Sequence, residues 1–336
     1  TWKTNIYIIL FIYNNMNVKI KKTKRGMKIR PVGKEAFPIK TKPDYPKAHF
    51  LLTAFGKRGS GKTTSVSSLI KEGVRDKVFD EVFVVSPTYQ SNKDMFLQFG
   101  EAFDPDTNLR EPRKDSADDI ENFVNGLAEY YDNYLDEMEM YDELKNKKKS
   151  ELEIMDLDYY YEKGIVDEEG FIKKPDYKYH NKPPRAVAII DDAVGTDVYI
   201  GTGAKKMTSL ALKHRHISPM RHGGVLGISL ALLAQTVATN MGSIPRAVRE
   251  NSTHIIIVGK TKDEKKQKQT YEEMGDGLTQ DQFFALWNFC CPEDDPHSFL
   301  FLDYNPKDRG KRFRKNFDSY VDIGDIKKLQ DKNKNI

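Results

Sequence analysis

Cysteine is nearly missing from this sequence of 336 residues. The only two, Cys290 and Cys291, are neighbours, so they supply neither a framework of disulfides nor the spaced ligands of a zinc site. We therefore expect packed thiols in a protein of a reducing compartment. Long hydrophobic runs are missing too. The longest one near the start, residues 6–13, is far too short to span a bilayer and lacks the small-residue cleavage site of a signal peptide.

The first residues have an unusual composition. The sequence opens on Thr1, and residues 1–15 are rich in Asn, Ile and Tyr, as translated AT-rich upstream DNA would be. We interpret this stretch as not part of the natural protein, with Met16 or Met27 as the true start. Seven Lys and Arg residues follow within a short stretch, so we expect residues 1–47 to form a basic N-terminal arm.

Charge is segregated along the chain, although the net charge is only +4. Residues 101–170 hold 23 Asp and Glu against 8 Lys and Arg, a net charge of −15 that leaves +19 for the rest. A second basic cluster occupies residues 307–315 and predicts a C-terminal basic arm. Such segregation suggests a polyanionic partner for the basic parts. The alternative is that each arm, taken alone, is a solvated tail.

Residues 48–64, with the sequence AHFLLTAFGKRGSGKTT, predict a strand over 49–55, a glycine-rich turn, and a helix from Thr63 to about Lys71. The turn matches G-x-x-x-x-G-K-[ST], the P-loop, whose backbone N–H groups surround a phosphate. An ordinary glycine-rich turn is the alternative. We expect the loop to bind the phosphates of ATP through Gly56, Lys57, Arg58, Gly59, Ser60, Gly61, Lys62, Thr63 and Thr64.

A second motif follows from residues 186–192, AVAIIDD. A parallel strand that is buried on both faces is continuously apolar, and ligands of open α/β sheets bind at the carboxyl ends of such strands. The segment therefore has the form of a Walker B strand. We expect Asp191 to hold Mg²⁺ together with Thr63, and Asp192 to polarise the attacking water. The apolar run 225–234 ends at Gln235, whose amide could sense the γ-phosphate or orient water.

The remaining chain divides into a core and an insertion. Apolar and aromatic residues at helical spacing, with acidic residues between them, predict a helical insertion. Further strands are expected over 81–86, 253–258 and, as the last one, 299–303, with helices from 245, over 264–274 and over 279–289. The predicted organisation is a basic arm over 1–47, the P-loop half of the core over 48–103, the acidic helical insertion over 104–182, the Walker B half over 183–317, and a tail over 318–336.

Together, GKRGSGKTT, EVFVVSPTY, AIIDD, RHGGVLGISLALLAQT and IPRAVRENSTHIIIV resemble the virion DNA-packaging ATPases of large DNA viruses, the poxvirus-like branch of the FtsK-HerA superfamily. The resemblance covers about residues 48–91 and 184–317. It implies a ring, a pentamer or hexamer, that threads double-stranded DNA and hydrolyses ATP at subunit interfaces. It also implies a capsid or portal protein as partner, and a location in the virion and the virus factory of the host-cell cytoplasm.

The resemblance also implies roles for single residues. Gln235 becomes the polar sensor, and an arginine from the neighbouring subunit completes each site. Arg221 is the first candidate for this arginine, and Arg215 is the second, because the Arg-His pair occurs twice. The acidic pair Asp191-Asp192 stands where the wider superfamily commonly has Asp-Glu.

The sequence thus predicts a RecA-like α/β P-loop NTPase core with a mostly parallel central sheet, a helical insertion and basic arms. The predicted function is an ATP-driven motor on viral DNA. A P-loop nucleoside or small-molecule kinase is one alternative; it would carry a lid with several arginines, and its activity would not respond to DNA. A nucleotide-dependent switch without motor activity is the other alternative.

Overall fold

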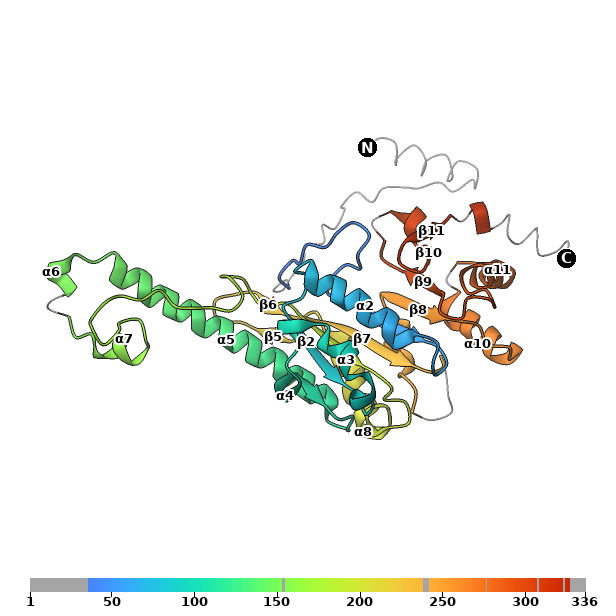
Figure 1. The fold of residues 1–336 in the computed structure, drawn as a ribbon, viewed down its shortest axis with the longest axis horizontal. Coiled ribbons are helices and arrows are strands. Elements are labelled where there is room, and N and C mark those ends of the chain that lie inside the picture. The colour runs from blue at the N-terminus through green and yellow to red at the C-terminus, as the bar shows by residue number, and fades with distance from the viewer. Residues whose placement is uncertain are drawn as a thin grey trace, which may run out of the picture. The chain divides into compact units, whose positions relative to one another are not determined.

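The computed structural model describes residues 36–152, 155–237, 242–275, 277–306, 308–322 and 324–326. Most of the predicted N-terminal arm, up to residue 35, lies outside this part. Nine strands form one sheet in the order β11-β10-β9-β8-β1-β7-β4-β2-β3 (Figure 1). Their bounds are β1 Leu51–Phe55, β2 Glu81–Val85, β3 Leu109–Arg110, β4 Ala186–Ile190, β7 Ile228–Ala234, β8 His254–Val258, β9 Phe299–Asp303, β10 Phe313–Lys315 and β11 Ser319–Val321.

The sheet is parallel from β8 to β3, and β9, β10 and β11 add an antiparallel edge. In the centre, β1 pairs with β7 from Leu51↔Leu230 to Phe55↔Ala234. Every residue of β1, β2, β4 and β7 is buried. Parallel strands covered on both faces must be apolar throughout, which is the pattern that the sequence shows. The predicted α/β fold with a mostly parallel sheet is confirmed.

Helices cover both faces of the sheet and form two hydrophobic cores. On one face, α2 (Lys62–Arg75) and α3 (Tyr89–Leu97) contribute Val66, Ile70 and Phe96 to the first core. On the other face, the second core includes residues of α5 (Ser116–Lys145), α8 (Gly201–Lys213) and α11 (Gln280–Cys290). The other helices are α4 Pro105–Asn108, α6 Lys149–Leu152, α7 Asp158–Glu162, α9 Arg246–Glu250 and α10 Glu264–Met274. None of the described helices combines the length and hydropathy that crossing a membrane requires.

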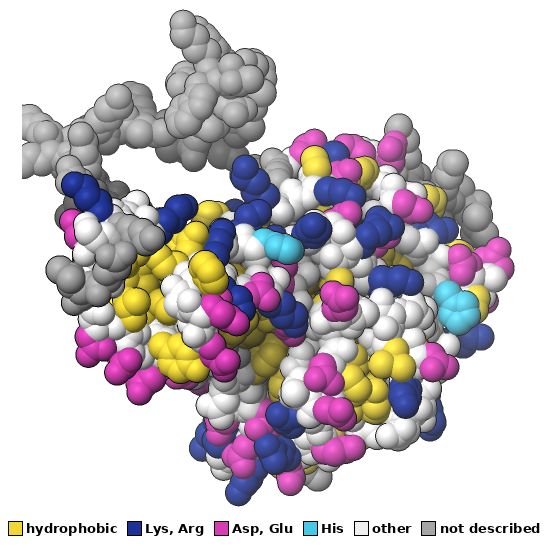
Figure 2. Space-filling view, turned by 60° about the vertical axis from the view of Figure 1, so that its left-hand side comes forward, with side chains coloured by type: hydrophobic (Ala, Val, Ile, Leu, Met, Phe, Trp, Pro, Cys, Tyr) yellow, Lys and Arg dark blue, Asp and Glu magenta, His cyan; other side chains and the backbone are white. Residues whose placement is uncertain are grey.

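Helix α5 has 30 residues and carries the predicted insertion. Its first half packs on the core through Ile120 and Val124, and ion pairs join it to α8, such as Lys213 Nζ to Glu121 Oε2 at 2.8 Å. Its second half projects beyond the sheet (Figure 1) and ends in the arm tip, residues 140–172, which has a small core of its own. Figure 2, which brings this side forward, shows hydrophobic side chains beside acidic ones.

The insertion begins later than residue 104, where the sequence placed it. Leu109 and Arg110 form β3, which pairs with β2 through Val84↔Leu109 and so extends the sheet. The Asn108 amide also donates a hydrogen bond of 3.0 Å to Glu81, at the start of β2. Residues up to 110 therefore belong to the core. The sequence did not indicate this, because a two-residue strand gives no periodic signal.

The described part of the C-terminal basic cluster is not an arm but part of the sheet. Strand β9 was expected to be the last, yet β10 and β11 follow it. Arg314 lies in β10 and is only 3% exposed. Its guanidinium is 3.6 Å from Asp303 and donates a 2.6 Å bond to the Asp44 carbonyl. Because these acceptors pair with the guanidinium, the charged side chain of Arg314 can be buried at the sheet edge. Asp44 is far from Arg314 in the sequence.

The apolar run 225–234 is also divided. Val225 and Leu226 form β6, which pairs with β5 (Ser218–Pro219) in a separate hairpin, and β7 starts only at Ile228. Gly227 lies between them, where a Cβ atom would be 2.6 Å from the Arg215 carbonyl oxygen. The close approach of the two backbones explains the glycine and the break.

Candidate active site

The P-loop connects β1 to α2 at the carboxyl edge of the parallel strands. Gly59 and Gly61 have φ of 75° and 88°, in the left-handed region that glycine adopts without strain. The Gly56 N–H donates a 3.2 Å hydrogen bond to the Ala234 carbonyl, which fixes the start of the loop against β7. At the other end, the first N–H groups of α2 have no partner within the helix. They create the positive end of the helix dipole, which favours phosphate.

The acidic pair follows β4, two strands away from β1. The Thr63 hydroxyl donates a 3.1 Å hydrogen bond to Asp191 Oδ1, so the predicted metal ligands lie together. Asp191 is 1% exposed and Lys62 is 7% exposed. Burial raises the pKa of Asp191, while the Lys62 ammonium and the bond from Thr63 act in the opposite direction.

These residues fit a magnesium ion. The second oxygen of Asp191, Oδ2, is buried and has no hydrogen-bond partner in the described part of the chain. A buried carboxylate oxygen without a donor is unfavourable unless a cation or water binds it. Carboxylate and hydroxyl oxygens are the ligands that Mg²⁺ prefers. Asp191 and Thr63 would therefore hold the ion.

Asp192 and Gln235 also meet. The Gln235 amide donates a 3.1 Å hydrogen bond to Asp192 Oδ1, although the two residues follow different strands, β4 and β7. Asp192 has a φ of 53°, which is uncommon for a residue other than glycine and is typical of functional sites. The pair lies at the same sheet edge as the P-loop, where the sequence predicted a water-polarising carboxylate and a polar sensor.

The two arginines lie elsewhere. Arg221 occupies the turn between β5 and β6, which precedes the amino end of β7, whereas the P-loop lies at the carboxyl end. Its guanidinium is 2.9 Å from Asp136 and donates a 2.9 Å bond to Asn133, both on α5. Arg215 lies at the same edge as Arg221 and is exposed. Neither arginine enters the nucleotide site of its own chain.

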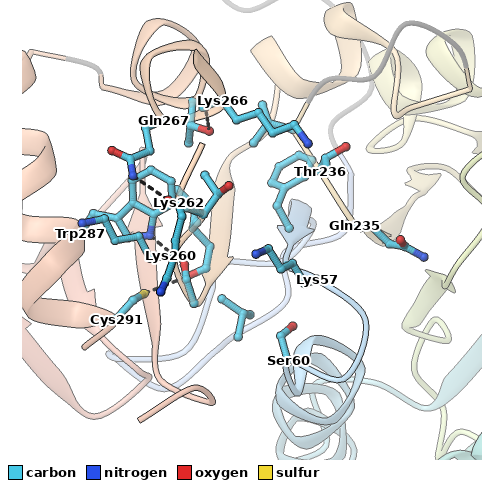
Figure 3. A pocket seen from close by; sticks show the side chains of 18 of the residues that line it. Lys57, Ser60, Gln235, Thr236, Lys260, Lys262, Lys266, Gln267, Trp287 and Cys291 are labelled. Atoms are coloured by element: carbon cyan, nitrogen blue, oxygen red, sulfur yellow. Dashed lines mark hydrogen bonds between the residues drawn. The ribbon is translucent and has the colours of Figure 1, made fainter. Parts of the chain in front are cut away.

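A cavity of about 690 Å³ continues from the P-loop and is large enough for a nucleoside. Lys57, Ser60, Gln235 and Thr236 line one side of it. Figure 3 shows the opposite wall, which the sequence did not predict and which comes from the end of β8, the loop after it, α10 and α11. This wall includes Lys260, Lys262, Lys266, Gln267, Trp287 and Cys291.

Trp287 is fixed in this wall because its indole N–H donates a 2.9 Å bond to the Gly259 carbonyl. No motif marks these residues. Only the position of β8 beside β1, at the same carboxyl edge, could have indicated them.

Two further features complete the surroundings of the loop. His297 Nδ1 lies 3.1 Å from the Ser60 carbonyl, a contact that no sequence pattern indicated. Cys290 and Cys291 are both buried, and burial raises the pKa of the Cys291 thiol to about 12. The two thiols are packed, as expected, and their raised pKa makes them poor nucleophiles.

The fold and the site define a P-loop NTPase with a RecA-like α/β core. No protein-family model and no curated protein matches the sequence. Among solved structures, the chain is similar to the genome packaging NTPase B204 from Sulfolobus turreted icosahedral virus 2 in complex with AMPPCP, at 12% identity and a TM-score of 0.38, over 82% of this chain and 98% of that one.

Two other solved structures are similar. One is the pCW3 conjugation coupling protein TcpA with ATPγS, at 14% identity and a TM-score of 0.40, over 98% of this chain and 86% of that one. The other is EssC (ATPases 2 and 3) from Geobacillus thermodenitrificans, at 15% identity and a TM-score of 0.39, over 94% of this chain and 52% of that one.

Proposed function

We propose that this protein is an ATPase that moves double-stranded viral DNA into a capsid. The ATPase activity is supported by two hydrogen bonds beside the P-loop, one from Thr63 to Asp191 and one from Gln235 to Asp192. The DNA part rests on the sequence motifs and on the segregated charge. The proposal includes a homo-oligomeric ring, a pentamer or hexamer, a capsid or portal protein as partner, and a location in the virion and the cytoplasmic virus factory.

Each group at the site has a distinct task. Lys62 and the N–H groups at the start of α2 offset the charge of the β- and γ-phosphates. Thr63 and Asp191 would hold Mg²⁺, which when bound would offset the negative charge of the phosphate oxygens. Asp192 accepts a proton from the attacking water, and Gln235 holds the Asp192 carboxylate in place through their 3.1 Å hydrogen bond.

The remaining part of the proposal is an arginine from the neighbouring subunit. Arg221 cannot serve its own site from the opposite sheet edge, but its side chain is 60% exposed and can face another copy. Arg215, at the same edge, is the alternative. A guanidinium placed at the transferring phosphate is typically worth about 10³ to 10⁵ in rate. Hydrolysis should therefore depend on assembly.

The deciding experiment measures ATP hydrolysis with and without long double-stranded DNA, on the wild type and on Lys62→Ala. We expect DNA to stimulate the wild type and Lys62→Ala to be inactive in both conditions. Phosphate transfer to a nucleoside without any response to DNA would show a kinase. Binding of ATP without turnover would show a switch.

A further inference from the structure

A second cavity of about 920 Å³ lies at the sheet edge opposite the P-loop. Its walls come from the residues before β1 and β8, from the end of β9 and from the turn after α8, and β1 and β8 both begin here. We call it the basic groove. Its polar lining includes Lys47, His49, Arg215, His216, Asn305 and Arg312.

Two cations of the groove, Lys47 and Arg215, have no acidic partner in the described part of the chain. No Asp or Glu is among its described lining residues. The side chains of Lys47, Arg215 and His216 make no hydrogen bond or ion pair with another described residue. Two lysines of α8 differ in this respect, since Lys206 and Lys213 are both paired with acids of α5. Unpaired cations of like charge repel each other, so a bound anion would stabilise them.

The walls of the groove also hold polar side chains that are buried or fixed in orientation. His49 is 8% exposed, and its Nδ1 atom is buried without a hydrogen-bond partner in the described chain. Arg312 stacks on the ring of Tyr304, with 5.4 Å from its Cζ atom to the ring centroid, and this contact orients the guanidinium. Phe37 and Tyr304 add aromatic surface to the lining.

We propose that the basic groove binds the phosphodiester backbone of DNA, a proposal that rests on the function proposed above. Lys, Arg, His and Asn side chains are the usual donors to phosphate oxygens and sugars. The cations Lys47, Arg215 and Arg312 come from three separate segments of the chain and line the same groove, as a backbone with several phosphates requires. A single phosphate, such as the γ-phosphate of a neighbour's nucleotide, would need only one or two of them.

The test is the binding of a labelled 30-base-pair duplex to the full chain, followed by fluorescence anisotropy over a range of salt concentrations. The variant is Lys47→Ala/Arg215→Ala, because both side chains are exposed and their loss removes no core volume. Each lost phosphate contact lowers the slope of log K against log[salt] by about 0.9, so we expect a decrease of about 2. The affinity should fall by about tenfold or more at moderate salt.

The matched control is Lys93→Ala/Lys205→Ala, which removes two exposed lysines of α3 and α8 that do not line the groove. It should bind the duplex like the wild type. Thermal melting curves and circular dichroism check that all variants are folded. Arg312→Lys serves as a third variant, which keeps the positive charge but loses the planar group that stacks on Tyr304, so its slope of log K against log[salt] should stay near that of the wild type.

Three outcomes would overturn the proposal. If the wild type binds DNA and the groove variant binds it equally well, the groove proposal fails while the proposed function stands. If the wild type does not bind DNA at all, both fail. If Arg215→Ala alone abolishes hydrolysis without DNA and leaves the affinity for DNA unchanged, the groove faces a neighbour's nucleotide instead.

Discussion

Thr63 and Asp191 are 128 positions apart in the chain, yet the hydroxyl of one donates a 3.1 Å hydrogen bond to the carboxylate of the other. The contact joins the start of α2 to the end of β4 across the strand β7, and Asp191 is almost completely buried there. Burial raises the pKa of Asp191, so the site without a cation is an unfavourable place for a negative charge. Stability and metal binding are therefore coupled at this residue.

Asp191→Asn should stabilise the protein at neutral pH when Mg²⁺ and nucleotide are absent. Folding raises the pKa of the Asp191 carboxyl above its unfolded value of 3.8. Such a group contributes to the stability of the folded state while it is protonated, below the unfolded pKa, and this contribution is lost as the pH rises through the folded pKa. Asn does not ionise, so the gain should be present near pH 7 and should vanish toward pH 4. Each kcal/mol corresponds to about 2–4 °C in Tm. Melting curves between pH 4 and 8 measure it, and a lower Tm for the variant near pH 7 would contradict the argument.

The two acids should differ in turnover. Asp192→Asn should retain nucleotide binding and Mg²⁺ dependence but lose about 10²- to 10⁴-fold in kcat, since it removes the proton acceptor. Asp191→Asn should in addition require more Mg²⁺ for half-maximal activity, because it removes a negatively charged ligand. Steady-state hydrolysis over a Mg²⁺ titration separates the two, with Asp197→Asn, an exposed acid after β4, as control. Identical profiles for Asp191→Asn and Asp192→Asn would refute this division of tasks.

Gln235→Glu should shift the pH dependence of hydrolysis. The substitution places a second carboxylate where the amide now lies 3.1 Å from Asp192 Oδ1. Like charges at this distance raise each other's pKa, so the acidic limb of the pH–rate profile should move to higher pH. Gln235→Ala should lower the rate without moving the limb. An unshifted limb in Gln235→Glu would mean that Asp192 is not the group that accepts the proton.

The site was predictable where a local pattern fixes both the residue type and the place in the sheet. The P-loop, Asp191, Asp192 and Gln235 all follow apolar strands, and the carboxyl ends of parallel strands meet at one edge. The wall around Trp287 was not predictable, because its position depends on how α11 packs against the loop after β8. Likewise, Arg314 was assigned to a basic arm because its acceptor, the Asp44 carbonyl, is 270 positions away.

The arm tip should be dispensable for hydrolysis. Residues 140–172 contain their own small hydrophobic cluster, and the tip carries an excess of acidic residues that would repel DNA. Replacing this segment by a short Gly-Ser linker should leave the fold and any stimulation by DNA intact. Removing residues 104–177 should instead prevent folding, because it deletes β3 and the core residues of α5. Loss of stimulation in a folded tip deletion would place the arm on the DNA path.

Arg221 has two competing roles, and its ion pair with Asp136 allows them to be separated. If the arginine only anchors α5, then Arg221→Ala and Asp136→Asn, which both break the 2.9 Å contact between these side chains, should both lower Tm without affecting hydrolysis. If it completes a neighbour's site, Arg221→Ala should lose about 10³-fold or more in kcat, whereas Asp136→Asn leaves the guanidinium present and active. We expect the second result.

Mixing subunits gives the stricter form of this test. Arg221→Ala subunits and Lys62→Ala subunits are each expected to be inactive, but a mixed ring contains interfaces with one intact P-loop and one intact arginine. Hydrolysis should therefore recover in the mixture. Recovery only when Arg215→Ala replaces Arg221→Ala would move the role to Arg215 and remove that residue from the basic groove. No recovery in either mixture, with variants that still assemble with the wild type, would mean that the site is completed within one chain.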